Sequence, residues 1–285
     1  MSDVVETGRI WVALDALERS EAPLGAAVGL ARILQAELAA LFVENVDLFR
    51  MADFPQAFET RLFGQHDPAG QQGLERLEAA LRAQASALQR QLVRTAGASG
   101  LRWSFRIARG RVLQQALEVA GAGDCVVLPS AAIATSLAIT RTGSPTRAGV
   151  ATRAGAVLPQ RGAIASARPA GLRLAGSPQL WALPGAGPRA RRALEIAHRL
   201  LDQDGPGRLV LPEDPREAAE LRDWLRERGW QDEWREASLA DLQAARQRPG
   251  GAGAGILLLP RPADGAERAR LEGSLRRAGW PIVMV

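Results

Sequence analysis

The amino-acid sequence predicts an α/β protein built from two tandem copies of a repeated β-α pattern with parallel strands. Short apolar segments, bounded by glycine, proline or acidic residues, alternate along the chain with segments whose apolar residues recur at helical spacing. The alternation restarts near residue 180. Short stretches recur there: WVAL at 11–14 is similar to WAL at 181–183, and VVLP at 126–129 to LLLP at 257–260. A tandem duplication explains this repetition most simply.

A stretch rich in alanine, glycine and arginine separates the two halves. Residues 160–179 show weak periodicity and are interrupted by prolines and glycines, which is typical of a linker. We therefore expect a first domain at 1–161, a linker at 162–178 and a second domain at 179–285.

The first half begins with a β-α-β unit. Residues 9–15 form an apolar run that ends in an acid, 21–37 have the spacing of an amphipathic helix, and 38–44 form a second apolar run. Such strands should be parallel, with a right-handed crossover. The other elements expected in this half are a long helix at 71–95, an edge strand at 102–108, helices at 111–120 and after Pro145, and strands at 125–128 and 154–158.

The second half repeats the alternation and ends in an apolar strand at 281–285. As an unshielded edge, this strand needs a partner. We expect it to pair with the strand at 154–158, or to take part in self-association. The other expected elements are strands at 180–183, 208–211, 230–236 and 255–259, and helices at 188–202, 215–228, 239–247 and 265–278.

The charge pattern predicts no nucleic-acid partner. The net charge is +5 and the positive charges are all arginine, but they are mixed with glutamates rather than gathered in a stripe with aromatic residues. The apolar runs are far shorter than the roughly 20 residues of a membrane span, and the first ten residues lack the pattern of a secretory signal. A single cysteine, Cys125, agrees with a reducing compartment. We therefore expect a cytoplasmic protein with no membrane partner.

The stretch at 124–148 has the features of an anion or nucleotide site. A buried strand at 125–128 is followed by a loop that ends in Gly143, Ser144 and Pro145, a combination typical of a helix start. Phosphate groups bind where a helix N-terminus follows the carboxyl end of a parallel strand. The residues alone leave open whether this copy still binds one.

An irregular segment at 45–64 contains most of the phenylalanines, including Phe49, Phe54 and Phe58. Two interpretations are open. The rings pack onto the sheet or the next helix of their own chain, or they form a surface for a protein partner or a second copy.

With its elements in this order, the first half resembles a universal stress protein (UspA-like) domain. The resemblance rests on the ordered series RIWVALD, LAALFVENVDL, RWSFRIARG, DCVVLP and TGSPTRAGVATRAGAVL. It covers about 9–161 and extends more faintly over 180–285. The resemblance implies a doubly wound, five-stranded parallel sheet of the adenine-nucleotide alpha hydrolase-like type, with helices on both faces, in two tandem copies. Such domains are often paired into dimers through the last strand, or are fused in tandem.

The same resemblance implies a nucleotide site in the first half. Asp15 matches the acid at the end of the first strand, and Val43 the residue beside the base. Gly143 and Ser144 match the end of the phosphate loop, and Ser130 lies at the start of that loop.

Two positions depart from the pattern of nucleotide-binding members. Pro129 and Ala132 stand where those members carry glycine, and proline has no N–H to offer a phosphate. The second half departs further, with Pro184 and Gly185 near the place of the strand-end acid. We therefore expect no certain cofactor, with ATP possible in the first domain only.

Three classes of function follow as alternatives. The first is a non-enzymatic stress-response or regulatory protein that acts through dimerisation or protein partners, with weak or lost nucleotide binding. The second is an ATP-binding switch in which Arg141 or Arg147 replaces the missing amides. The third, an enzyme, is disfavoured because His66 and His198 are isolated and no metal-ligand spacing occurs, so we expect no catalytic or metal-binding residues.

Overall fold

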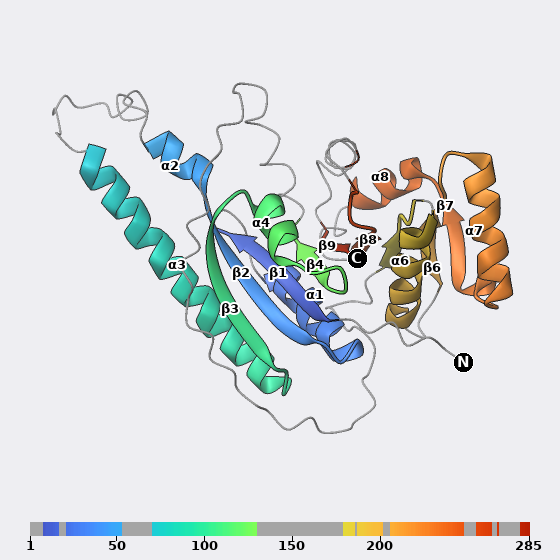
Figure 1. Ribbon diagram of the computed structural model, residues 1–285, viewed down its shortest axis with the longest axis horizontal. Helices are drawn as coiled ribbons and strands as arrows, with labels where there is room; N and C mark the ends of the chain where they lie inside the picture. Colours follow the sequence, from blue (N-terminus) through green and yellow to red (C-terminus); the bar gives the residue numbers. More distant parts are fainter. Residues whose placement is uncertain are drawn as a thin grey trace.

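The computed structural model describes residues 8–16, 21–52, 70–129, 179–185, 187–201, 206–247, 255–263, 267 and 280–285. They form an α/β structure around one nine-stranded sheet in the order β3-β2-β1-β4-β9-β8-β5-β6-β7 (Figure 1). The α/β fold class is therefore confirmed. The strands are β1 (Arg9–Asp15), β2 (Glu37–Asn45), β3 (Trp103–Gly110), β4 (Cys125–Leu128), β5 (Gln179–Ala182), β6 (Gly207–Val210), β7 (Trp234–Ala237), β8 (Gly255–Leu259) and β9 (Ile282–Met284).

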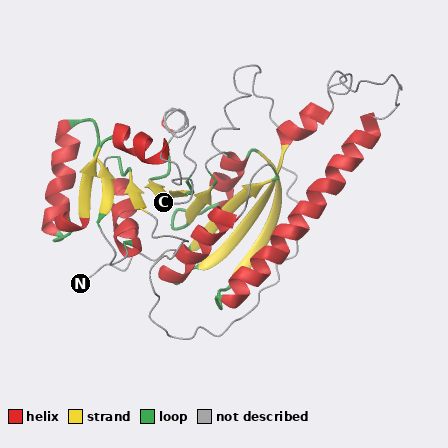
Figure 2. Ribbon diagram, turned by 180° about the vertical axis from the view of Figure 1, so that it is seen from behind, coloured by secondary structure: helices red, strands yellow, loops and turns green. Residues whose placement is uncertain are grey.

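Helices cover both faces of this sheet (Figure 2). Buried residues of α1, α3, α6 and α7 share one core with alternate strand residues such as Val12 and Leu258, whereas α4 and α8 pack with the other strand residues, such as Trp11 and Leu257. The helices are α1 (Glu21–Ile33), α2 (Val46–Ala52), α3 (Gly70–Ala98), α4 (Val112–Val119), α6 (Gly187–Leu200), α7 (Pro215–Glu227), α8 (Leu239–Gln247) and the short 3-10 helix η2 (Gln231–Glu233).

The two halves of the sheet have the same winding. In the first half β1 lies between β2 and β4, with β3 beyond β2, and all these pairs are parallel. In the second half β5 lies between β6 and β8, with β7 beyond β6 and β9 beyond β8, again all parallel. Parallel neighbours with helices on both faces make this a doubly wound sheet.

Strand β9 joins the two halves. It runs parallel to β8 and antiparallel to β4, where Val283 is opposite Val127. The sequence-based pairing of this last strand with 154–158 is wrong, since both edges of β9 are occupied. The four residues of β4 are all buried and need a neighbour on each side, and the equally apolar β9 supplies the second one. Residues 154–158 and the linker at 162–178 lie outside the described residues.

Most elements differ from the sequence-based ranges by one to three residues, two boundaries differ by four, and helix α2 lies in the segment at 45–64 that was expected to be irregular. Helix α1 ends at Ile33 rather than continuing to 37, because Gln35 has a left-handed backbone (φ 53°) that ends the helix before β2 begins. Strand β7 begins at Trp234, since residues 231–233 form a 3-10 turn.

The close approach of Gly255 and Trp280 provides a stability test. A Cβ at position 255 would lie 2.5 Å from the Trp280 ring, which is itself buried beside Trp181. We expect Gly255→Ala to lower the free energy of unfolding by about 1–3 kcal/mol, because the ring has little room to move. Gly97→Ala on α3, where nothing lies within 4 Å, is the matched control and should be neutral or stabilising. Equal urea midpoints for the two variants would contradict this packing.

Candidate functional site

The carboxyl edge of β1 and β2 brings two of the sequence-predicted site residues together. Asp15 ends β1 and is directly paired in register with Val43 of β2. Both are buried, with 6% of Asp15 and none of Val43 exposed. The other three candidates, Ser130, Gly143 and Ser144, lie outside the described residues.

Strand β4, which pairs with β1, is followed at this edge by a proline. Pro129 is buried and directly follows Leu128, two residues beyond the register pair of Val127 with Val12 of β1. A backbone N–H at this point could approach a phosphate, but proline has none. Asp15 and Val43 are therefore brought together at this edge, whereas the end of β4 offers no backbone N–H to a phosphate at Pro129.

A polar group beyond Val43 was not foreseen from the sequence. The side-chain oxygen of Asn45 accepts a hydrogen bond from the Asp47 backbone N–H at 3.0 Å, and the Asp47 side chain is only 7% exposed. Its carboxylate oxygens lie 3.5 Å from Arg50 Nη1 and 3.8 Å from Arg111 Nε. Asp47 lies in the first turn of α2 and Arg111 directly precedes α4, so the contact between them ties the start of α2 to the turn after β3. The signal in the sequence was an acid two residues after β2, Asp47, and an arginine directly after the neighbouring strand β3, Arg111.

Arg109 covers part of the phenylalanine-rich segment. It forms a 3.0 Å ion pair with Glu44 and places its guanidinium 4.1 Å from the centre of the Phe49 ring. Phe49 also packs partly buried against the main core. The Phe49 ring therefore packs onto its own chain, which is the first of the two interpretations given for the segment at 45–64. Phe54 and Phe58 lie outside the described residues.

The corresponding edge of the second half carries no acid in the position of Asp15. Strand β5 is followed by Leu183 and the buried Pro184, and β8 is followed by the buried Pro260. A shallow depression nearby is lined by Gly185, Gly187, Arg191, Glu217, Glu220 and Leu221. Its mixed charges favour no particular ligand.

His198 is part of a packed aromatic group. Its ring stacks on Trp230 with ring centres 3.8 Å apart, and its Nδ1 lies 2.5 Å from Glu233 Oε2. Trp224 meets Trp230 edge-on, and Arg228 lies over both indole rings. These contacts join α6 to the end of α7 and to η2. They explain His198 as a packing residue.

Cys125 lies fully buried at the start of β4. Burial raises the pKa of its thiol to about 12, although the nearby Arg192 and Arg261 act in the opposite direction. At about pH 8 roughly one thiol in ten thousand is ionised, and the thiolate is the reactive form. We expect no reaction with Ellman's reagent in the native state and one equivalent after denaturation. Rapid stoichiometric reaction of the folded protein would contradict this burial.

The described segments contain no group of three or more histidine, cysteine, aspartate or glutamate side chains placed to hold a metal ion. None of their helices is both long and apolar enough to cross a membrane.

The described segments define an α/β protein with a doubly wound sheet, in which Asp15 and Val43 are paired at the carboxyl edge of β1 and β2. No known family model matches the chain, and no curated protein matches it. Among solved structures, it is similar to a universal stress protein from Archaeoglobus fulgidus, with 13% identity, coverage of 98% of this chain and 96% of that one, and a TM-score of 0.47.

Proposed function

We propose that this chain is a universal stress-type regulatory protein that acts through protein partners, without catalytic turnover and with weak or lost nucleotide binding. The ordered sequence series, the repeated winding of the two half-sheets and the pairing of Asp15 with Val43 support this class. The same winding in both halves also supports an origin by tandem duplication, with a second half that has lost the strand-end acid.

The proposal that nucleotide binding is weak or lost is based on the position of Pro129. A phosphate chain is held mainly by backbone N–H groups and a helix N-terminus. At the end of β4 the first of these amides is replaced by a buried proline. The adenosine side of the site can persist in Asp15 and Val43, but the phosphates lose their first donor.

Calorimetric titration of ATP, with and without magnesium, tests this proposal. We expect no heat of binding at micromolar ATP and no thermal stabilisation beyond that of a salt control. Micromolar binding that disappears in Asp15→Asn would reject the proposal. Asp223→Asn is the matched control, because Asp223 is an exposed acid on α7.

An ATP-binding switch is the second candidate, favoured by the intact pairing of Asp15 with Val43. It requires arginine side chains such as Arg141 or Arg147, which lie outside the described residues, to replace the missing amides. The switch would be established if ATP binding is lost in Asp15→Asn and if ATP binds more weakly to Arg141→Gln or Arg147→Gln than to the wild type.

We propose that the partner surface includes the phenylalanine-rich segment at 45–64. Sedimentation of the wild type and Phe54→Asp tests self-association through this segment. A dimer that becomes a monomer in Phe54→Asp would support it, and a monomeric wild type would exclude the homodimer and direct the search to other proteins.

A further inference from the structure

One edge of the nine-stranded sheet is strongly basic. The segment at 79–117 contains seven arginines and no aspartate or glutamate, although arginines and acids are mixed over the chain as a whole. It comprises most of α3, all of β3 and most of α4. Strand β3 is the first strand in the sheet order, and α3 packs beside it (Figure 1). The positive charge therefore gathers along this edge.

Acids from other elements neutralise only part of this charge. Three of the seven arginines have a carboxylate within ion-pair distance: Arg82, Arg109 and Arg111. Glu37, at the start of the neighbouring β2, pairs instead with Arg9 of β1 at 3.2 Å. The other four are exposed, and within the segments that the structure describes no carboxylate forms an ion pair with them: Arg90, Arg94, Arg102 and Arg106. We call these four residues the basic edge.

The backbone of β3 is open on its outer side. Among the described strands, β3 pairs only with β2. The Arg102 carbonyl oxygen accepts a hydrogen bond from the Leu38 N–H of β2 at 2.9 Å, and the polar groups of successive strand residues point to opposite sides. Those of Trp103, Phe105 and Ile107 therefore point away from β2. An edge of eight residues without a proline can accept a further strand.

The side chains of β3 favour an acidic strand at this edge. Trp103 and Phe105 are buried in the core that includes α3, whereas Arg102 and Arg106 alternate with them and are exposed on the opposite face. Arg106 lies 5.4 Å from the centre of the Trp11 ring, an exposed contact that is weak enough to be exchanged for a carboxylate. Opposite charges across two strands attract and like charges repel. The arginines therefore favour an acidic partner over a second copy of β3.

A nucleic acid is the other class of partner that such charge could attract. Proteins that bind single strands combine basic residues with aromatic rings on which bases stack. The aromatic rings near the basic edge are buried, with Trp103 and Phe105 each 7% exposed and Trp11 1% exposed. A nucleic acid also cannot continue the β-ladder. The open backbone and the buried rings therefore favour a peptide.

We propose that β3 binds an extended acidic segment of a partner protein, which adds a strand to the sheet. Its backbone pairs with the outer side of β3, and acids on alternate residues lie opposite Arg102 and Arg106. Arg90 and Arg94 of α3 attract it through their charge. The inference rests on the proposed action through protein partners. It does not involve the edge that carries Asp15, so ATP titration and peptide binding can fail independently.

Fluorescence anisotropy with a labelled peptide of alternating glutamate and valine, as long as β3, tests this surface. We expect saturable binding to the wild type that weakens as sodium chloride is added. The same peptide with methylated backbone nitrogens keeps its charges but cannot donate ladder hydrogen bonds, so it should not bind. A peptide of alternating lysine and valine should not bind either, because the basic edge repels it.

Paired variants test the arginines. Arg102→Gln combined with Arg106→Gln should raise the Kd of the acidic peptide by about three- to tenfold, because two cross-strand ion pairs are lost. Arg191→Gln combined with Arg216→Gln is the matched control. It removes two exposed arginines from α6 and α7 in the second half and should leave the Kd unchanged.

Hydrogen exchange followed by mass spectrometry locates the bound peptide. The peptide should slow exchange in β3 and leave β7, the strand at the opposite edge of the sheet, unchanged. If the variant with two glutamines fails to fold, this measurement and the methylated peptide decide with the wild type alone.

Four results would overturn the proposal. They are absence of binding to the wild type, an equal Kd for the plain and the methylated peptide, slowed exchange elsewhere but not in β3, and tighter binding of a single-stranded oligothymidine than of the acidic peptide. The last result would assign the basic edge to nucleic acid. Slowed exchange in β3 at high protein concentration without peptide would assign it to a second copy and would reject the acidic partner.

Discussion

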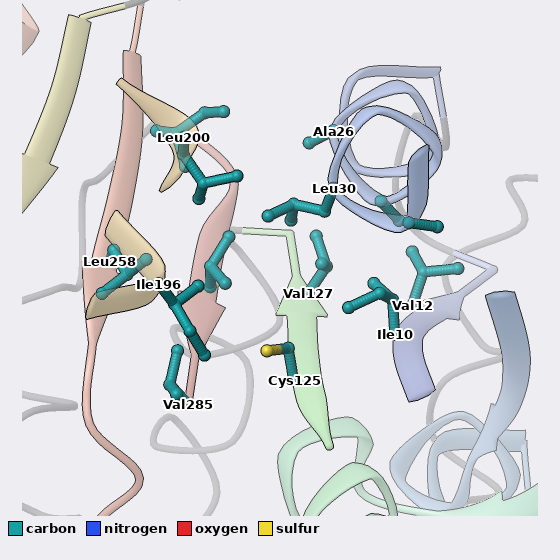
Figure 3. Packing of buried hydrophobic residues seen from close by; sticks show 14 of the residues in the cluster. Ile10, Val12, Ala26, Leu30, Cys125, Val127, Ile196, Leu200, Leu258 and Val285 are labelled. Atoms are coloured by element: carbon teal, nitrogen blue, oxygen red, sulfur yellow. The ribbon is translucent and has the colours of Figure 1, made fainter. Parts of the chain in front are cut away.

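Val283→Asp is expected to unfold both halves of the protein together. Val283 is the middle residue of β9, is fully buried, and is paired with Val127 on one side and Leu258 on the other. A carboxylate there would lie in the core that α1 and α6 share (Figure 3). An unpaired buried charge of this kind costs about 4 kcal/mol or more.

Urea unfolding followed by circular dichroism measures this effect. The same substitution at Val93, which is 43% exposed on α3, is the matched control and should change the free energy of unfolding by less than about 1 kcal/mol. A two-step transition in Val283→Asp, with one half still folded at the wild-type midpoint, would contradict the role of β9 as a shared strand.

Asp124→Ala is expected to produce the second largest loss of stability. The Asp124 carboxylate accepts three hydrogen bonds, from the Arg9 N–H at 2.9 Å, Trp11 Nε1 at 3.0 Å and the Gly121 N–H at 2.9 Å. It thus holds the turn before β4 against the start of β1. Removing it leaves the donor of the buried Trp11 ring without a partner, so we expect a loss of about 2–4 kcal/mol.

The control for this variant is Asp223→Ala. Asp223 is 65% exposed and pairs with Arg226 on the same helix, and exposed pairs of this kind contribute at most about 1 kcal/mol. Asp124→Asn keeps one acceptor oxygen and should recover part of the loss. If Asp124→Ala and Asp223→Ala unfold at the same urea concentration, the carboxylate does not stabilise this turn.

The local sequence pattern was sufficient to predict most strands and helices, whereas Asp15 and Val43 were selected through the family resemblance. Apolar runs such as 9–15 and 38–44 are long enough to identify buried parallel strands, and adjacent strands of a β-α-β unit place their ends at one edge. The end of α1 before Gln35 could not be predicted, because glutamine rarely adopts the left-handed backbone conformation that Gln35 has here.

Contacts between distant segments were not predictable. The pairing of β9 with β4 joins residues more than 150 positions apart. The apolar sequence of β9 shows that it is buried, but it would fit beside any other buried apolar strand equally well. The contacts of Arg192, Arg261 and Asp47 likewise depend on how the halves and turns meet in space. Charged residues on a helix or after a strand are usually solvated, so the sequence contains no sign that Asp47 is buried and that Arg192 and Arg261 are half-buried.

The antiparallel pairing of β9 with β4 unites the two half-sheets, because β9 also pairs with β8. Cysteines introduced at Val126 and Met284, in a Cys125→Ala background, test it directly. Directly opposed residues of antiparallel strands have Cα atoms about 4.5–5.5 Å apart, within the roughly 4.4–6.8 Å that a disulfide spans. Val126 and Met284 are such a pair.

Oxidation of the folded double variant and peptide mapping by mass spectrometry give the readout. We predict a disulfide within one chain between positions 126 and 284. A second variant with cysteines at Leu41 and Met284 should form none, since β1 and β4 separate β2 from β9. Free thiols at 126 and 284, or bridges only between chains, in a protein that remains folded would contradict the shared strand.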